Sequence, residues 1–130
     1  MQLMQNVVAI ICVYCCTLSI MINNFYTELI LRNLIAELKT VTDWHSLGIH
    51  LGVPGHQLKK IEQDFQSMER RKAEVLQYWL GNCPAENRSW QTIVAALKAM
   101  DCENLAKKLK KKYANNQSLV TGKFIFHVLL

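Results

Sequence analysis

The chain has 130 residues, of which 51% are apolar, and this suits one folded domain with short flanks. Its five Gly and two Pro exclude a collagen-like or generally disordered chain. The formal charge of +5, with a pI near 9.0, is compatible with acidic proteins, anionic lipid or nucleic acid and selects none of them.

An almost unbroken apolar segment opens the chain over residues 1–24, and no charged side chain precedes Glu28. Residues 3–22 reach roughly the 20-residue length that a membrane-spanning helix needs. A basic stretch and a cleavage site, which mark a secretory signal, are not evident. Three interpretations stay open for this segment: a membrane anchor, an extra helix packed on the following domain, or a chain start unrelated to that domain.

Residues 25–39 predict the first helix of the domain, because apolar residues recur there at helical spacing. A short second helix follows, capped by Thr42 or Asp43. Gly48 would let a neighbouring helix approach closely, and Gly52 would end the helix. Pro54 suits the first turn of a third helix, where its missing N–H costs nothing.

Three more amphipathic helices are expected before residue 114. Ser67, Ser89 and Asp101 are the predicted caps of the fourth, fifth and sixth helices. The tail 115–130 is polar at first and then apolar over 124–130, and no structure is predicted for it.

Apolar residues that repeat every three or four positions define the expected core of these helices. They include three Trp, which are far more often packed in a core than used for binding. The predicted core residues are Trp44, Leu47, Leu51, Leu58, Ile61, Leu76, Trp79, Trp90, Leu97, Leu105 and Leu109. Together they predict an all-α bundle with no strand.

The order and spacing of one set of residues resemble those of the death domain over about residues 25–114. The set is Trp44, Leu47, Gly48, Leu51, Gly52, Val53, Leu58, Ile61, Leu76, Trp79, Leu80, Trp90, Leu97, Leu105-Ala106 and Leu109. This resemblance implies a six-helix antiparallel Greek-key bundle, here with an extra N-terminal apolar helix. It implies a non-catalytic adaptor of apoptotic or innate-immune signalling, which binds other death-domain proteins or copies of itself through homotypic contacts.

Charged residues on three helices are the candidate protein-interaction sites, since charge complementarity sets partner choice. The fourth helix carries Arg70, Arg71 and Lys72, the third carries Lys59, Lys60, Glu62 and Asp64, and the sixth carries Lys107 and Lys108. A solvated helix face explains such charges equally well. The expected location is cytoplasmic, with membrane tethering if residues 3–22 form an anchor.

No enzyme, cofactor or metal site is expected. Five Cys at scattered spacings do not form a disulfide framework. A P-loop, a dinucleotide-binding loop and a nucleophile elbow are all missing from the sequence. The alternative from another class is a helix-turn-helix DNA-binding protein, with a recognition helix after Pro54. Nucleic acid is nevertheless not the expected partner, because three long amphipathic helices follow that pair.

Overall fold

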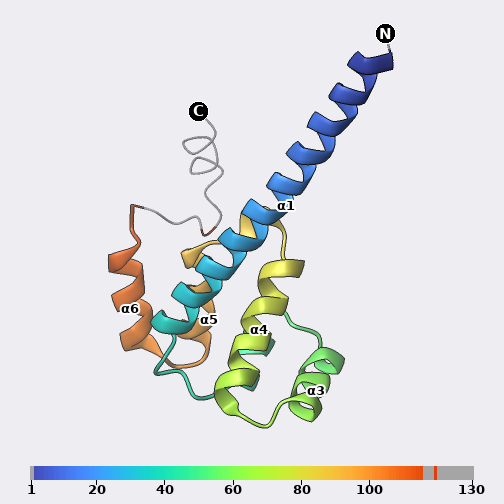
Figure 1. The fold of residues 1–130 in the computed structure, drawn as a ribbon. Helices are drawn as coiled ribbons and strands as arrows, with labels where there is room; N and C mark the ends of the chain where they lie inside the picture. The colour runs from blue at the N-terminus through green and yellow to red at the C-terminus, as the bar shows by residue number, and fades with distance from the viewer. Residues whose placement is uncertain (1, 116–118, 120–130) are drawn as a thin grey trace. The chain divides into compact units, whose positions relative to one another are not determined.

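The computed structural model describes residues 2–115 and Leu119, and in that part every regular element is helical (Figure 1). The elements are α1 (Gln2–Glu37), α2 (Trp44–His50), α3 (Gly55–Asp64), α4 (Met68–Asn82), the short 3-10 helix η1 (Ala85–Asn87), α5 (Trp90–Ala99) and α6 (Glu103–Lys112). The predicted all-α class is therefore confirmed. The apolar segment 124–130 lies outside the described residues.

The chain divides into two compact units, Met1–Ile30 and Leu31–Leu130, and α1 contributes to both. The sequence suggests that an N-terminal helix ends near residue 24 and that a separate domain helix begins there, but α1 continues through this position. Helical structure runs without interruption from Gln2 to Glu37. The reason is that this stretch contains no Gly or Pro to interrupt the hydrogen-bonding pattern of the helix.

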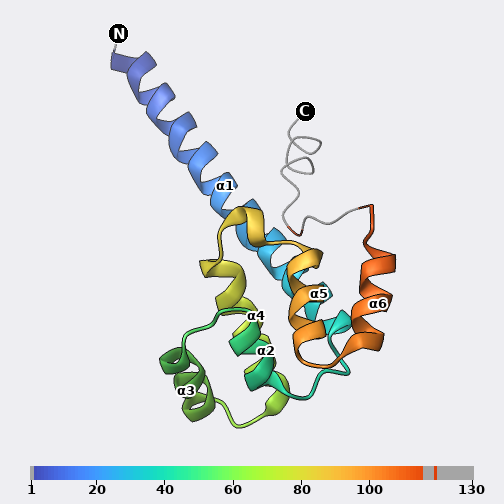
Figure 2. The ribbon, with the colours of Figure 1, turned by 180° about the vertical axis from the view of Figure 1, so that it is seen from behind.

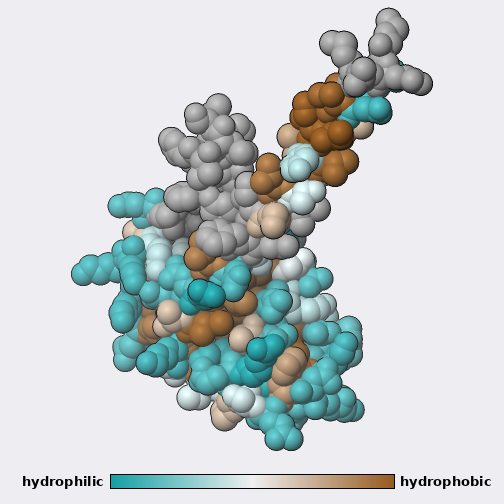
Figure 3. All heavy atoms as spheres, viewed as in Figure 1, coloured by the Kyte–Doolittle hydropathy of each residue, from teal (hydrophilic) through white to brown (hydrophobic). Residues whose placement is uncertain are grey.

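Within the first unit, large apolar side chains are exposed along α1, among them Val8, Ile11, Val13, Tyr14 and Met21. The space-filling view shows the N-terminal part of α1 as largely hydrophobic (Figure 3). Within the described part of the chain, no helix combines the length and the apolar character required to cross a membrane.

The second unit is a bundle in which α2 contacts α3, α4 and α5. α5 and α6 lie side by side in both ribbon views (Figures 1 and 2). Its interior contains Leu34, Leu38, Trp44, Leu47, Leu51, Leu58, Ile61, Val75, Leu76, Trp79, Trp90, Ile93, Leu97 and Leu109. Leu105 differs from the other expected core residues, since it is only partly buried. It lines a surface hollow beside Thr40 and Val41 instead.

Three helices begin with a side-chain cap at the position that the sequence predicts. Asp43 Oδ1 accepts a hydrogen bond from Ser46 N at 3.0 Å. Ser67 and Ser89 start α4 and α5 in the same way. Each cap satisfies one of the backbone N–H groups that have no partner within the helix.

Asp101 is not the cap of α6, contrary to the prediction. The cap position is Cys102, which makes no side-chain capping bond. Asp101 lies one residue earlier with φ +61°, in the left-handed region that Asp tolerates better than most residues. The connection between α5 and α6 is so short that this residue must turn the chain rather than begin the helix.

Two glycines in and after α2 are required by the geometry. Gly52 has φ +84° and ends the helix in the conformation that glycine adopts without steric cost. A Cβ at Gly48 would overlap Leu58 Cδ2. Gly48 therefore lets α3 pack closely against α2.

We expect Gly48→Ala to destabilise the domain by about 1–3 kcal/mol, because the buried Leu58 side chain would have to move. Gly81→Ala is the matched control, since Gly81 is an exposed helical glycine with open space around its Cβ position. That control should be neutral or stabilising by up to about 1 kcal/mol. Urea denaturation followed by circular dichroism measures both. Equal effects at the two positions would contradict the close approach of α2 and α3.

Candidate protein-interaction surface

Three consecutive basic residues of α4 point in three directions, because successive residues of an α-helix are rotated by about 100°. Arg70 is exposed, Arg71 is partly buried and Lys72 is buried. Only one of these three candidate interaction residues therefore presents its charge freely to solvent.

Lys72 does not lie on the exposed face that the sequence analysis assigned to it. It is 1% exposed and lies on the same stripe of α4 as Leu76 and Trp79. Its Nζ donates to Leu38 O at 3.1 Å and to Val41 O at 3.0 Å. The ammonium group thus binds carbonyls of the segment that leaves α1, beyond the regular hydrogen bonds of the helix. Leu38 O also accepts from Val41 N at 3.0 Å, whereas Lys72 supplies the donor to Val41 O.

A carboxylate next to the ammonium group completes the surroundings of Lys72. Glu69 Oε2 lies 3.3 Å from Lys72 Nζ, and Glu69 itself is exposed. A buried charge is tolerated in proteins when it is paired and hydrogen-bonded. Lys72 meets both conditions, and we assign it a structural role in the bundle.

Arg71 also binds backbone carbonyls. Its Nε donates to Phe65 O at 2.6 Å, and one terminal nitrogen donates to Glu62 O at 2.9 Å. These carbonyls belong to the C-terminal end of α3. The guanidinium group also lies 5.4 Å from the centre of the Trp44 ring, within the range of a cation–π contact. Two of the N–H donors of Arg71 and one face of its guanidinium group are therefore used within the domain.

Arg70 is the member of the three that reaches solvent, with 62% of its side chain exposed. It forms an ion pair with Glu74 at 3.2 Å and lies 5.2 Å from the centre of the Phe65 ring. An exposed pair of this kind contributes little to stability. Arg70 can therefore leave Glu74 and pair with a carboxylate of a partner protein at a low cost in free energy.

The candidate residues on α3 are all exposed: Lys59, Lys60, Glu62 and Asp64. Two cations thus precede two anions within one helix of ten residues. The face of the second unit that includes α3 and α4 is mostly hydrophilic (Figure 3).

On α6, the candidates Lys107 and Lys108 are also exposed. They belong to a series of five lysines that ends at Lys112. Lys112 Nζ lies 2.5 Å from Glu37 Oε1, and this hydrogen bond raises the pKa of Lys112. Because the folded-state pKa is raised, the contribution of this pair is present at neutral pH and is lost only when strongly alkaline solution removes the proton.

Comparison with known families identifies the bundle. The family model of the death domain matches residues 30–113, which is most of the chain and most of the helical bundle. The chain belongs to the death-domain family. No curated protein matches the chain, and no solved structure does. A death domain is a protein-interaction module of signalling proteins.

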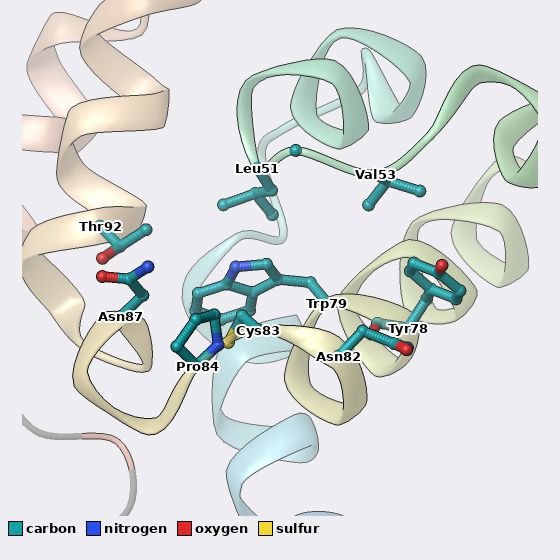
Figure 4. A pocket seen from close by; sticks show the side chains of 10 residues that line it. Leu51, Val53, Tyr78, Trp79, Asn82, Cys83, Pro84, Asn87 and Thr92 are labelled. Carbon is teal, nitrogen blue, oxygen red and sulfur yellow. The ribbon is translucent and has the colours of Figure 1, made fainter.

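The death domain also has a surface pocket that the sequence analysis did not identify. It has a volume of about 240 Å³ and is lined by the α2–α3 connection, the end of α4, η1 and the start of α5. Figure 4 shows the Trp79 indole between Leu51 and Pro84, with Tyr78 and Asn82 on one side and Asn87 and Thr92 on the other. No sequence signal marks the pocket, because four separate segments supply its lining.

We expect Lys72→Met to destabilise the death domain by about 1–3 kcal/mol, because Val41 O would lose the Lys72 donor and Leu38 O would keep only its bond from Val41 N. Lys39→Met is the control, since Lys39 is an exposed lysine close by and its loss should cost within about 0.5 kcal/mol. Thermal melts of both variants provide the measurement. A melting temperature for Lys72→Met that equals the wild-type value would show that these hydrogen bonds do not stabilise the fold.

Substitutions at Arg70 and Arg71 should differ in their effect on the stability of the domain. Arg71→Gln removes two hydrogen bonds from a charged group and should cost about 1.5–3 kcal/mol. Arg70→Gln removes an exposed pair one helical turn apart and should cost about 0.5 kcal/mol or less. Urea denaturation of the two variants makes the comparison. The structural assignment of Arg71 would be wrong if both changes were equally mild.

Proposed function

We propose that this death domain is a non-catalytic adaptor module that assembles cytoplasmic signalling complexes of the apoptotic or innate-immune type. It would do so by binding other death domains or further copies of itself. The observation that carries the proposal is the exposed set of charges of both signs on α3 and α4. Lys59, Lys60 and Arg70 lie on the same two helices as Glu62 and Asp64, and all five are exposed.

The arrangement of these charges supports an asymmetric contact between two domains. On α3 the cations lie near the middle and the anions near the C-terminal end. The cationic part of one copy could therefore meet the anionic part of the next. A contact between two different patches continues in an open or helical assembly when the rotation does not close. Lys107 and Lys108 on α6 are further exposed candidates for such contacts.

Membrane association through residues 3–22 forms a second part of the proposal. Its support is the exposed apolar surface of α1, where Val7, Ile10 and Leu18 are each more than half exposed. A segment of this kind gains free energy when it leaves water. Sedimentation of the chain with neutral and anionic vesicles tests this part separately.

The test of homotypic assembly is light scattering of the full chain against concentration and salt. We expect particles larger than the 15.0 kDa monomer, and we expect Arg70→Glu or the pair Lys59→Glu and Lys60→Glu to shift them toward the monomer. Like charges brought together in an interface cost several kcal/mol, which is enough to abolish a contact of ordinary affinity. Arg71 and Lys72 are unsuitable for this test, because changes there would act on stability.

Lys39→Glu is the matched control for charge, since Lys39 is exposed and lies outside the α3 and α4 surfaces. Circular dichroism verifies that each variant keeps its helical content. If the chain still self-associates after each charge-reversing substitution on α3 and α4, these helices do not form the interaction surface. Salt-sensitive binding of duplex DNA without any self-association would instead support the helix-turn-helix alternative.

A further inference from the structure

A groove between α5 and α6 has a chemistry that differs from the rest of the surface. It has a volume of about 370 Å³ and is lined by Gln91, Val94, Ala95, Lys98 and Lys110. Val94 is buried, while the other lining residues are exposed. The groove thus combines an apolar floor with two ammonium groups at its rim.

The sequence of α5 explains why a hollow forms at this place. Gln91, Ala95 and Lys98 occupy positions i, i+4 and i+7 and so share one stripe of the helix. Ala95 is the smallest of them, and its methyl group leaves the space beside Val94 unfilled. Nearby, the rings of Trp90 and Tyr113 stack with centres 3.9 Å apart and planes within 8°. This stacked pair joins the start of α5 to the end of α6 and holds the two walls together.

The charge around this groove has one sign. The side-chain ammonium groups of Lys98 and Lys110 form no ion pair or hydrogen bond with any residue that the structure describes. The sequence of α5 contains no Asp or Glu, and no Asp or Glu follows Glu103 in the chain. The exposed Lys107 and Lys111 lie one turn before Lys110 and directly after it. No carboxylate side chain of α5 or of the later turns of α6 can neutralise the rim.

We propose that this groove binds an acidic amphipathic helix of a partner protein. An apolar side chain of that helix would occupy the hollow above Val94 and Ala95, and its flanking carboxylates would pair with Lys98 and Lys110. Charge complementarity identifies the class of partner, because a purely cationic rim requires anions that this part of the chain does not supply. The apolar floor favours a side chain of a peptide over a phosphate backbone or a lipid headgroup, which would contact the cations alone.

This inference goes beyond homotypic assembly. The α3 and α4 surface contains both charge signs and can pair with a copy of itself. The α5–α6 groove contains one sign and needs a partner of different composition. The two surfaces would let a single domain polymerise and recruit a second protein at the same time.

The test uses the full chain and a labelled synthetic peptide of about 18 residues, long enough to form a helix. The peptide has Leu at every third or fourth position and Glu at the positions beside them. Fluorescence anisotropy measures the affinity of the peptide for the chain. A second peptide with every Glu replaced by Gln shows how much of that affinity depends on the carboxylates. The same titrations with anionic vesicles and duplex DNA cover the other two classes of acidic partner.

Two pairs of variants make the test specific to the groove. The double variant Lys98→Glu and Lys110→Glu should weaken peptide binding roughly tenfold or more, because carboxylates would then face carboxylates. The double variant Lys59→Glu and Lys60→Glu changes the total charge equally and should leave binding within about twofold. Ala95→Phe fills the hollow and should also weaken binding, whereas Ala99→Phe places the same ring on an exposed position of α5 outside the groove.

The proposal is supported when both groove variants lose affinity for the peptide, both controls keep it, and all four variants retain wild-type helicity. The two groove variants and Ala99→Phe should also retain wild-type self-association, whereas the Lys59→Glu and Lys60→Glu control is expected to lose it. Equal losses in the two double variants would show non-specific attraction to net charge and overturn it. So would unchanged affinity in Ala95→Phe, because the apolar floor would then make no contact. Vesicles or DNA that bind through Lys98 and Lys110 more tightly than the peptide does would assign the groove to another class of partner, and the proposal would be wrong.

Discussion

The buried ammonium group of Lys72 fixes how the first and fourth helices of the bundle meet. A helix that ends inside a packed domain exposes backbone carbonyls that need donors, and Leu38 and Val41, which follow α1, are both buried. Lys72 supplies the donor from a distance of more than thirty residues in sequence. The segment that it holds leads directly into Asp43, the cap of α2. One side chain therefore ties α4 to the segment that joins α1 to α2.

At two other helix ends, a basic side chain likewise donates hydrogen bonds to backbone carbonyls. Arg71 binds carbonyls at the end of α3, and Arg88 donates to Cys83 O, which follows α4, at 3.2 and 3.3 Å. Long basic side chains suit this role, since they reach the last carbonyls of a helix and interact favourably with the negative end of its dipole. Some of the basic residues of the chain thus stabilise the bundle through hydrogen bonds to backbone carbonyls and are not available to bind a partner.

The sequence predicted the features that depend on local chemistry. Capping by Asp43, Ser67 and Ser89 needs only a short polar side chain before an apolar repeat. Gly52 was recognisable as a helix end because few other residues adopt its backbone conformation. These features, together with the apolar stripes, were sufficient to predict the class of fold and the family.

The features that were missed depend on contacts between distant segments. Lys72 lies in phase with Leu76 and Trp79, so its position on the buried stripe was visible in the sequence. Its charge suggested exposure, however, and the carbonyls that it binds become neighbours only after folding. Asp101 was misassigned for a similar reason, because its left-handed conformation follows from how tightly α5 and α6 are connected. The α5–α6 groove requires both helices, and neither helix predicts it alone.

Once the structural cations are set aside, the remaining charges fall into two groups with different neighbours. On α3 and α4, Lys59, Lys60 and Arg70 share their helices with exposed carboxylates, so their fields partly cancel at a distance and act mainly at contact. On α5 and α6, the four lysines from Lys107 to Lys111 have no acidic residue among them in the sequence, and Lys98 belongs to α5, which contains no Asp or Glu, so their fields add. A surface with both charge signs can be complementary to its own copy, whereas a surface of one sign repels its copy and attracts a foreign anion. The distribution of the acidic residues, more than that of the basic ones, therefore distinguishes a face for self-assembly from a face for recruitment.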